Sequence, residues 1–139
     1  DADGEYDPAE LERLVAPVLA GEADYVVGSR FAGGPRRMLP DRSLGNRVLT
    51  VAVSVVSRRR ITDGQSGYRA LSAEATAAAE VIHDFNYAQV LTLDLLAKGF
   101  RYTEVPISYR FRTQGQSFIR LGTYLRNVVP AVYTELNTA

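Results

Sequence analysis

The stretch DYVVGSRF (residues 24–31) decides the fold that we expect for this chain of 139 residues. The apolar run from Tyr25 to Val27 ends at Gly28, and a short apolar run between turn-forming residues is typical of a buried strand. A helix is predicted before it, because Asp7 and the proline after it form a helix start and apolar residues follow at helical spacing as far as Gly21. A helix that leads into a buried strand indicates an α/β fold.

Further elements follow this strand along the chain. We expect a loop over residues 33–40, a helix over 43–57, a turn over 62–67, a strand over 68–71, a helix over 73–79, a helix from Asn86 to Gly99, a strand over 102–112 and an amphipathic helix over 118–136. Pro106 has no backbone N–H to donate, which favours an edge position for the strand that contains it.

The composition describes one folded domain and excludes several classes of protein. Hydrophobic residues make up 46% of the chain and charged residues 23%, and the net charge of zero gives no argument for nucleic-acid binding. There is no cysteine, which rules out disulfides and thiolate metal sites and makes a cytosolic setting the simplest interpretation. The longest apolar stretch, residues 48–56, is far shorter than the roughly 20 residues that span a bilayer. Because the chain begins with Asp1 rather than Met, we expect a fragment.

Acidic residues crowd the first turn, DADGE. Asp1 and Asp3 are separated by one residue, and Glu5 can add a third carboxylate. Carboxylates held this close are costly unless a cation neutralises them, and hard oxygen ligands suit Mg²⁺ or Mn²⁺. The alternative is an acidic turn that caps the following helix and is otherwise solvated.

Arginines gather after the predicted buried strand. Arg30 follows the strand directly and Arg42 comes shortly after it, at the carboxyl end of a strand, where open α/β sheets bind ligands. The planar guanidinium matches phosphate oxygens, so these residues are candidates for a phosphate site. The alternative is a solvated run of arginines, which we prefer for residues 58–60.

The motifs DADG, VVGSRF, RSLGNRVLT, ITDGQSGYRALS and KGFRYTEVPISYRFRTQGQS occur in this order between residues 1 and 117. The series resembles the family 2 glycosyltransferases, and within them the dolichol-phosphate mannose synthase and polyprenyl-phosphate branch. The resemblance implies a GT-A fold with a Rossmann-like mixed sheet. Residues 1–139 would then form one partial catalytic domain, with a core over 1–116 and an amphipathic helix over 117–139. The N-terminal strands that bind the nucleotide are expected to be missing.

The same resemblance assigns roles to residues. Asp1 and Asp3 match the DxD motif that holds a divalent metal on the donor diphosphate, with Glu5 beside it, and the catalytic residues are expected to be Asp3 and Asp63. Asp63 would position the acceptor; its alternative is a turn aspartate that caps local amides. The implied donor or lipid-phosphate ligands are Arg30, Arg42, Arg112 and Ser117, and the implied acceptor-loop residues are Gln65 and Ser66. Glu104 is expected to secure a neighbouring loop.

The implied reaction is inverting transfer of a sugar from a GDP- or UDP-linked donor to a polyprenyl phosphate, with Mg²⁺ or Mn²⁺ as cofactor. The implied partners are these substrates and a membrane surface, on the cytoplasmic face, with no nucleic acid. The missing strands would leave a sheet edge open to pairing between copies, and the isolated chain is expected to be inactive. The alternatives are a family member with a soluble sugar or polysaccharide acceptor, and a non-catalytic interaction module.

Overall fold

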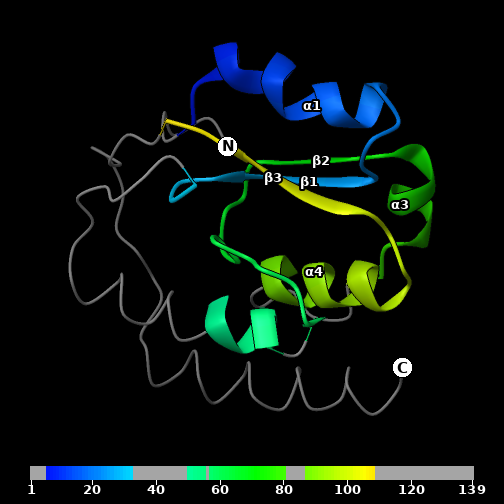
Figure 1. Cartoon of the computed structure of the whole chain (residues 1–139). Coiled ribbons are helices and arrows are strands. Elements are labelled where there is room, and N and C mark those ends of the chain that lie inside the picture. Colours follow the sequence, from blue (N-terminus) through cyan, green and yellow to red (C-terminus); the bar gives the residue numbers. More distant parts are fainter. Residues whose placement is uncertain (1–5, 33–49, 56, 81–86, 109–139) are drawn as a thin grey trace.

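The structure is a computed structural model that describes residues 6–32, 50–55, 57–80 and 87–108. Three layers are visible: helix α1 (Leu11–Leu19) covers one face of a sheet, and helix α4 (Tyr87–Ala97) covers the other (Figure 1). Residues 50–55 are helical and lie in the same layer as α4. Helix α3 (Ala73–Ala78) packs at one end of the sheet. The predicted α/β class is therefore confirmed for the described residues.

The described sheet has three strands in the order β2-β1-β3. The central strand β1 (Tyr25–Ser29) is buried along its whole length, which confirms the buried strand predicted there. It pairs antiparallel with β2 (Arg69–Leu71) and parallel with β3 (Tyr102–Pro106), so the sheet is mixed. Since β1 and β3 run parallel, their carboxyl ends lie together where Ser29 pairs with Pro106.

The first helix begins as the sequence predicts. The Asp7 side chain accepts a hydrogen bond from the Ala9 N–H at 3.0 Å, at the start of a 3-10 turn (Pro8–Glu10) that continues into α1. Proline suits this first position because its missing N–H would have no partner inside the helix. The predicted helix between Asp7 and Gly21 is confirmed, with a tighter first turn.

Residues at the ends of α3 and α4 determine where these helices begin or end. Ser72 caps α3 by accepting a hydrogen bond from the Ala75 N–H at 3.1 Å. Gly99 follows α4 with a φ of +84°, a left-handed conformation that glycine adopts without a steric penalty. The predicted helix ending at Gly99 is thus confirmed for the described residues.

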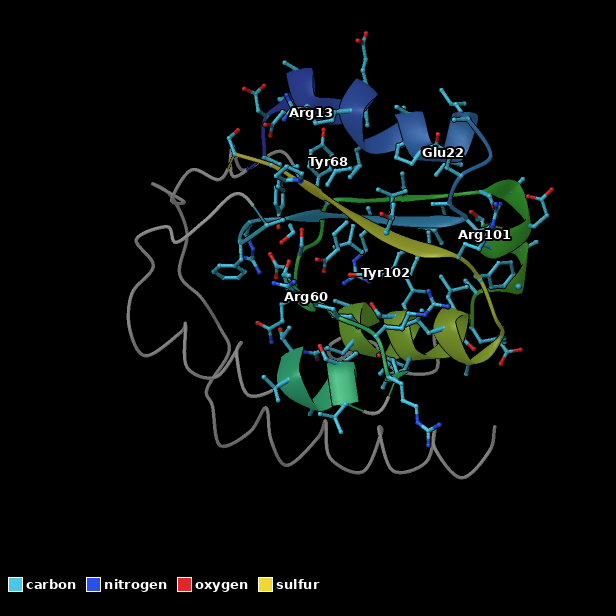
Figure 2. All side chains as sticks on the ribbon, in the orientation of Figure 1. Arg13, Glu22, Arg60, Tyr68, Arg101 and Tyr102 are labelled. Atoms are coloured by element: carbon cyan, nitrogen blue, oxygen red, sulfur yellow. The ribbon has the colours of Figure 1, made fainter. Side chains whose placement is uncertain are left out.

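Alternate residues of β1 face the two helical layers. Tyr25 and Val27 face α4, where they pack with Leu91 and Leu95, while Val26 faces α1 and packs with Leu14. Figure 2 shows Tyr102 of β3 directed into the α4 layer and Tyr68 between the sheet and the start of α1. Burial of β1 on both faces explains why its sequence is a continuous apolar run rather than an alternating one.

The last strand ends earlier than the pattern predicts. A strand is predicted over residues 102–112, but β3 ends at Pro106, residues 107 and 108 are not part of it, and residues 109–112 lie outside the described residues. The Ile107 N–H still donates to the Ser29 carbonyl at 3.1 Å, and the Ser108 N–H then turns to the Glu10 carboxylate at 2.9 Å. A contact with a distant acidic side chain therefore ends the strand. Its predicted edge position is confirmed within the described sheet.

Several predicted elements lie outside the described residues. They are the loop over 33–40, most of the helix over 43–57 and the helix over 118–136. None of the described helices is long and apolar enough to cross a membrane.

Leu14 tests the packing between α1 and the sheet. Its side chain is fully buried, so Leu14→Ala removes apolar contacts and leaves a cavity, and we expect it to lower the free energy of unfolding by about 2–5 kcal/mol. Leu19→Ala is the matched control in the same helix: Leu19 is 82% exposed, and a change within about 0.5 kcal/mol is expected. Urea unfolding measures both, and equal losses would contradict this packing.

The ion pair of Asp24 with Arg101 makes the free energy of unfolding depend on pH in the acidic range. Hydrogen bonds from the Arg101 side chain, and next from its backbone N–H, lower the pKa of Asp24 from 3.8 to about 2. A lowered pKa in the folded state stabilises the fold above pH 3.8 and loses that contribution as the pH falls toward 2. Asp24→Asn should therefore be less stable than the unchanged chain at neutral pH, with the difference closing over that window. Thermal unfolding against pH measures this, and a difference that is constant with pH would contradict it.

Candidate functional site

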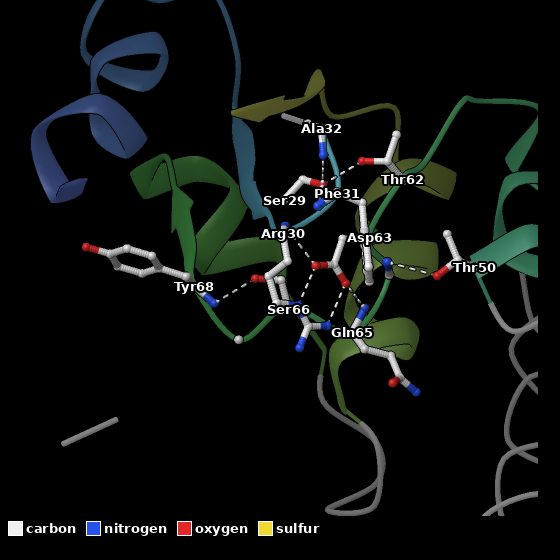
Figure 3. A network of polar contacts seen from close by, with 12 residues as sticks. Ser29, Arg30, Phe31, Ala32, Thr50, Thr62, Asp63, Gln65, Ser66 and Tyr68 are labelled. Atoms are coloured by element: carbon white, nitrogen blue, oxygen red, sulfur yellow. Dashed lines mark hydrogen bonds and ion pairs between the residues drawn. The ribbon is translucent and has the colours of Figure 1, made fainter. Parts of the chain in front are cut away.

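The candidate site forms where β1 and β3 end. Arg30 follows β1 directly, and the loop of residues 62–67 passes beside it on its way to β2 (Figure 3). In parallel strands the carboxyl ends meet at one edge, and ligands of open α/β sheets bind at such edges. The sheet topology therefore brings the GSR motif (residues 28–30) and the TDGQSG motif (residues 62–67) together.

A buried ion pair lies at the centre of this site. Arg30 Nε donates to Asp63 Oδ2 at 2.6 Å and Arg30 Nη2 donates to Oδ1 at 2.7 Å, so the two planar groups face each other as a fork (Figure 3). The Asp63 side chain is fully buried and that of Arg30 is 11% exposed. Such pairing through two hydrogen bonds compensates the charge of the guanidinium and also fixes its orientation.

The Asp63 carboxylate is fully engaged. Besides the fork, Oδ2 accepts the backbone N–H of Arg30 at 3.1 Å and Oδ1 accepts that of Gln65 at 3.3 Å. Each oxygen thus accepts two hydrogen bonds, which suits an anchoring anion better than a group that removes a proton. The hydrogen bond from the Gln65 N–H also fits the alternative interpretation of Asp63, a turn aspartate that caps local amides.

Glu104 of β3 holds the backbone that carries Asp63. Its Oε1 accepts the N–H of Thr62 at 2.9 Å and of Asp63 at 3.3 Å, and its Oε2 accepts the Thr62 hydroxyl at 2.6 Å. The Tyr102 phenol donates to Oε1 at 2.6 Å. The prediction that Glu104 secures a neighbouring loop is confirmed, and the loop is the one that bears Asp63.

Tyr102 stays protonated in this setting. Burial of the phenol is the largest effect, the negative charge of Glu104 comes next, and together they raise the pKa of Tyr102 far above its ordinary value. The phenol therefore donates to the Glu104 carboxylate over the whole physiological pH range.

Hydroxyl groups extend this network to the turn after β1. Ser29 Oγ lies 2.6 Å from Thr62 Oγ1, and because the Thr62 hydroxyl donates to Glu104, the Ser29 hydroxyl must donate to Thr62. Ser29 Oγ in turn accepts the backbone N–H groups of Phe31 at 3.2 Å and Ala32 at 3.0 Å. The turn that contains Arg30 is thereby tied to β3 through two hydroxyls.

The predicted acceptor loop is partly buried. Ser66 is fully buried and its Oγ accepts the Tyr68 N–H at 3.3 Å, whereas Gln65 is partly exposed. The Gly64 N–H donates to Thr50 Oγ1 at 3.2 Å, which links the loop to the helical residues 50–55. Gln65 is therefore the member of this pair with access to a ligand.

The structure brings together some of the predicted site residues. It places four of them around one loop: Arg30, Asp63, Gln65 and Ser66. The others lie outside the described residues: Asp1, Asp3, Glu5, Arg42, Arg112 and Ser117. Within the part of the chain that the structure describes, no group of three or more His, Asp or Glu side chains could hold a metal ion.

Three residues contribute hydrogen bonds to the site that the sequence does not predict. Ser29 and Thr62 carry the hydroxyl link, and Tyr6 accepts the Gly67 N–H at 3.1 Å through its hydroxyl oxygen. Their positions give a partial signal, because Ser29 and Thr62 flank Arg30 and Asp63 in the sequence. The contact of Tyr6 with a residue 61 positions away has no local signal.

Comparisons with known proteins point to sugar transfer. No protein-family model matches the chain. The polyprenol monophosphomannose synthase of Mycolicibacterium smegmatis is 36% identical over 84% of this chain and 46% of its own length. The undecaprenyl-phosphate mannosyltransferase of Micrococcus luteus is 30% identical over 84% of this chain and 50% of its own length. The glycosyltransferase AglJ of Haloferax volcanii is 29% identical over 83% of this chain and 38% of its own length.

The chain spans about half the length, or less, of these curated relatives. The matches nevertheless cover most of the chain, and the GSR and TDGQSG motifs form the paired site described above. The predicted resemblance to the family 2 glycosyltransferases of the polyprenyl-phosphate branch is thus confirmed: over most of its length the chain is similar to glycosyltransferases, two of which are polyprenyl-phosphate sugar transferases.

Proposed function

We propose that the protein containing this chain is a metal-dependent, inverting glycosyltransferase that moves a sugar from a nucleotide-diphosphate donor to a polyprenyl phosphate at the cytoplasmic face of a membrane. The observation that carries the proposal is the buried Arg30–Asp63 fork at the carboxyl ends of β1 and β3. The names of two relatives, a polyprenol monophosphomannose synthase and an undecaprenyl-phosphate mannosyltransferase, support the lipid phosphate as acceptor.

A phosphate acceptor fits the state of Asp63. A phosphate monoester loses its second proton near pH 6, so its oxygen is already a nucleophile at neutral pH and needs no base. A carboxylate whose oxygens accept four N–H groups is poorly suited to remove a proton, but it holds a guanidinium in one orientation. In this proposal Asp63 positions Arg30, and Gln65 faces the acceptor.

The transfer step itself is a displacement. An oxygen of the lipid phosphate attacks the anomeric carbon from the face opposite the nucleotide, and the bond from that carbon to the diphosphate oxygen breaks. The bonding electrons leave with the nucleoside diphosphate, and the configuration at the carbon inverts. Arginines beside the reacting groups compensate the phosphate charges, and Arg30, Arg42 and Arg112 are the proposed ones.

The acidic turn supplies ligands for the metal. Asp1, Asp3 and Glu5 offer the carboxylate oxygens that Mg²⁺ and Mn²⁺ prefer, so the donor set fits such an ion. When bound, the ion offsets the charge that grows on the leaving diphosphate.

The test is sugar transfer by the complete polypeptide that contains residues 1–139. We expect labelled sugar to pass from a GDP- or UDP-linked donor to polyprenyl phosphate in detergent, with loss of transfer on addition of EDTA. Transfer to soluble sugars but not to the lipid would favour the alternative acceptor. No transfer from any nucleotide sugar would contradict the proposal.

Asp3→Asn tests the proposed metal ligand. Loss of one carboxylate should lower the transfer rate about 100-fold or more, as for other groups that stabilise charge in a transition state. Asp24→Asn is the matched control, because Asp24 pairs with Arg101 rather than with any group of the candidate site. A rate for Asp3→Asn equal to that of the control would rule out the metal role.

Asp63→Asn tests the ion pair. The amide is neutral and cannot accept from both Nε and Nη2 of Arg30, which leaves a nearly buried cation without its partner. We expect the free energy of unfolding to fall by about 3–5 kcal/mol and the acceptor KM to rise. Arg101 has the same fork with Asp24 at an exposed position, so Asp24→Asn should cost much less. Chemical unfolding and transfer kinetics measure both variants, and equal losses would contradict a special role for Asp63.

A further inference from the structure

Arg69 is a second arginine of the site, and its surroundings differ from those of Arg30. It is the first residue of β2, opposite Val27 of β1, and its side chain is partly buried. Within the described residues, no carboxylate lies at ion-pair distance from it, and every hydrogen bond it donates goes to a neutral oxygen. Among the described residues, its contacts are therefore with backbone carbonyls and hydroxyl groups.

The acceptors of Arg69 belong to two separate parts of the fold. On one side, Nε donates to the Ser66 carbonyl at 2.7 Å and Nη2 to the Gly64 carbonyl at 3.3 Å. On the other side, Nη1 donates to the Ala88 carbonyl of α4 at 2.7 Å and to Thr92 Oγ1 at 3.1 Å. One guanidinium thus ties the loop of residues 64–66 to the first turns of α4.

Tyr25 completes this arrangement from the sheet. Arg69 Nη1 also donates to the Tyr25 hydroxyl, which lies 2.9 Å from Thr92 Oγ1, and the guanidinium carbon lies 5.6 Å from the centre of the Tyr25 ring. Tyr25 is fully buried in the central strand, so its position is set by the core. The loop is therefore tied to a fully buried residue of the central strand.

We propose that Arg69 is a positioning residue for the transfer reaction: by holding the Gly64 and Ser66 carbonyls against α4, it keeps the acceptor loop in its binding conformation before the acceptor arrives. This inference rests on the proposed function of the loop. With the carbonyls turned inward, the Gly64 N–H reaches Thr50 and the Gln65 N–H reaches Asp63. Arg69 consequently also supports the position of Asp63.

A lysine cannot replace this residue. Its ammonium is a single point on a flexible stem, whereas the guanidinium has three nitrogens that reach both the loop and α4 at once. Arg69→Lys keeps the positive charge but cannot hydrogen-bond to the loop carbonyls and to α4 at the same time. A positioning role therefore predicts a defect in Arg69→Lys, while a role that depends only on positive charge predicts none.

The experiment compares Arg69→Lys with Arg101→Lys in the complete polypeptide. Arg101 also donates to a backbone carbonyl, that of Gly21 at 2.6 Å, but outside the site, so it controls for the general effect of losing a guanidinium. Two quantities are measured: amide hydrogen exchange at Gly64 and Gln65 by NMR, and the KM values for polyprenyl phosphate and for the nucleotide sugar.

For Arg69→Lys we expect about tenfold faster exchange at both amides and an acceptor KM raised about tenfold, with the donor KM unchanged. Arg101→Lys should change none of these. Faster exchange with an unchanged acceptor KM would overturn the proposal, because the contact would then be structural alone, and unchanged exchange would overturn it outright. The exchange measurement needs no turnover. If the unmodified protein transfers no sugar, that result counts against the proposed function, while the exchange rates still test whether Arg69 holds the loop of residues 64–66.

Discussion

The described site depends on one interaction, the fork between Arg30 and Asp63. A carboxylate removed from water loses several kcal/mol of solvation, and that cost is offset only when charge and hydrogen bonds are both supplied. Here Arg30 supplies the charge and three of the four N–H groups, and Gln65 supplies the fourth. The pair also joins two loops that are 33 residues apart in the sequence, so the site can form only when β1 and the 62–67 loop have reached their final places.

The fork is kept in place by a directed chain of hydrogen bonds from the sheet. Tyr102 and Thr62 donate to Glu104, Ser29 donates to Thr62, and the turn after β1 donates to Ser29. Each hydroxyl has one possible direction, because a carboxylate at one end accepts only and backbone N–H groups at the other end donate only. A network with one hydrogen-bond pattern favours one conformation, which is what a preformed binding site requires.

The sequence predicts the parts of this fold that depend on local pattern. The apolar run at Tyr25 predicts a strand buried on both faces, and Asp7 predicts where the first helix begins. The predicted end of β3 is too late because the alternating pattern continues past Pro106. In the structure the Ser108 N–H instead turns to the carboxylate of Glu10, a residue 98 positions away in the sequence. The role of Arg69 could not be predicted, since its acceptors are carbonyls and hydroxyls that the fold alone brings together.

The charges of the described site place a further demand on the acceptor. Two cations, Arg30 and Arg69, and two carboxylates, Asp63 and Glu104, cancel in formal charge. Opposite charges as close as those of the fork have little combined effect several ångströms away. A phosphate at this site would therefore need positive charge in addition to that of Arg30, and in the proposed function Arg42 and Arg112 supply it. The described loops then fix the positions of Arg30 and Gln65, while the proposed function assigns the additional positive charge to residues outside the described part of the chain.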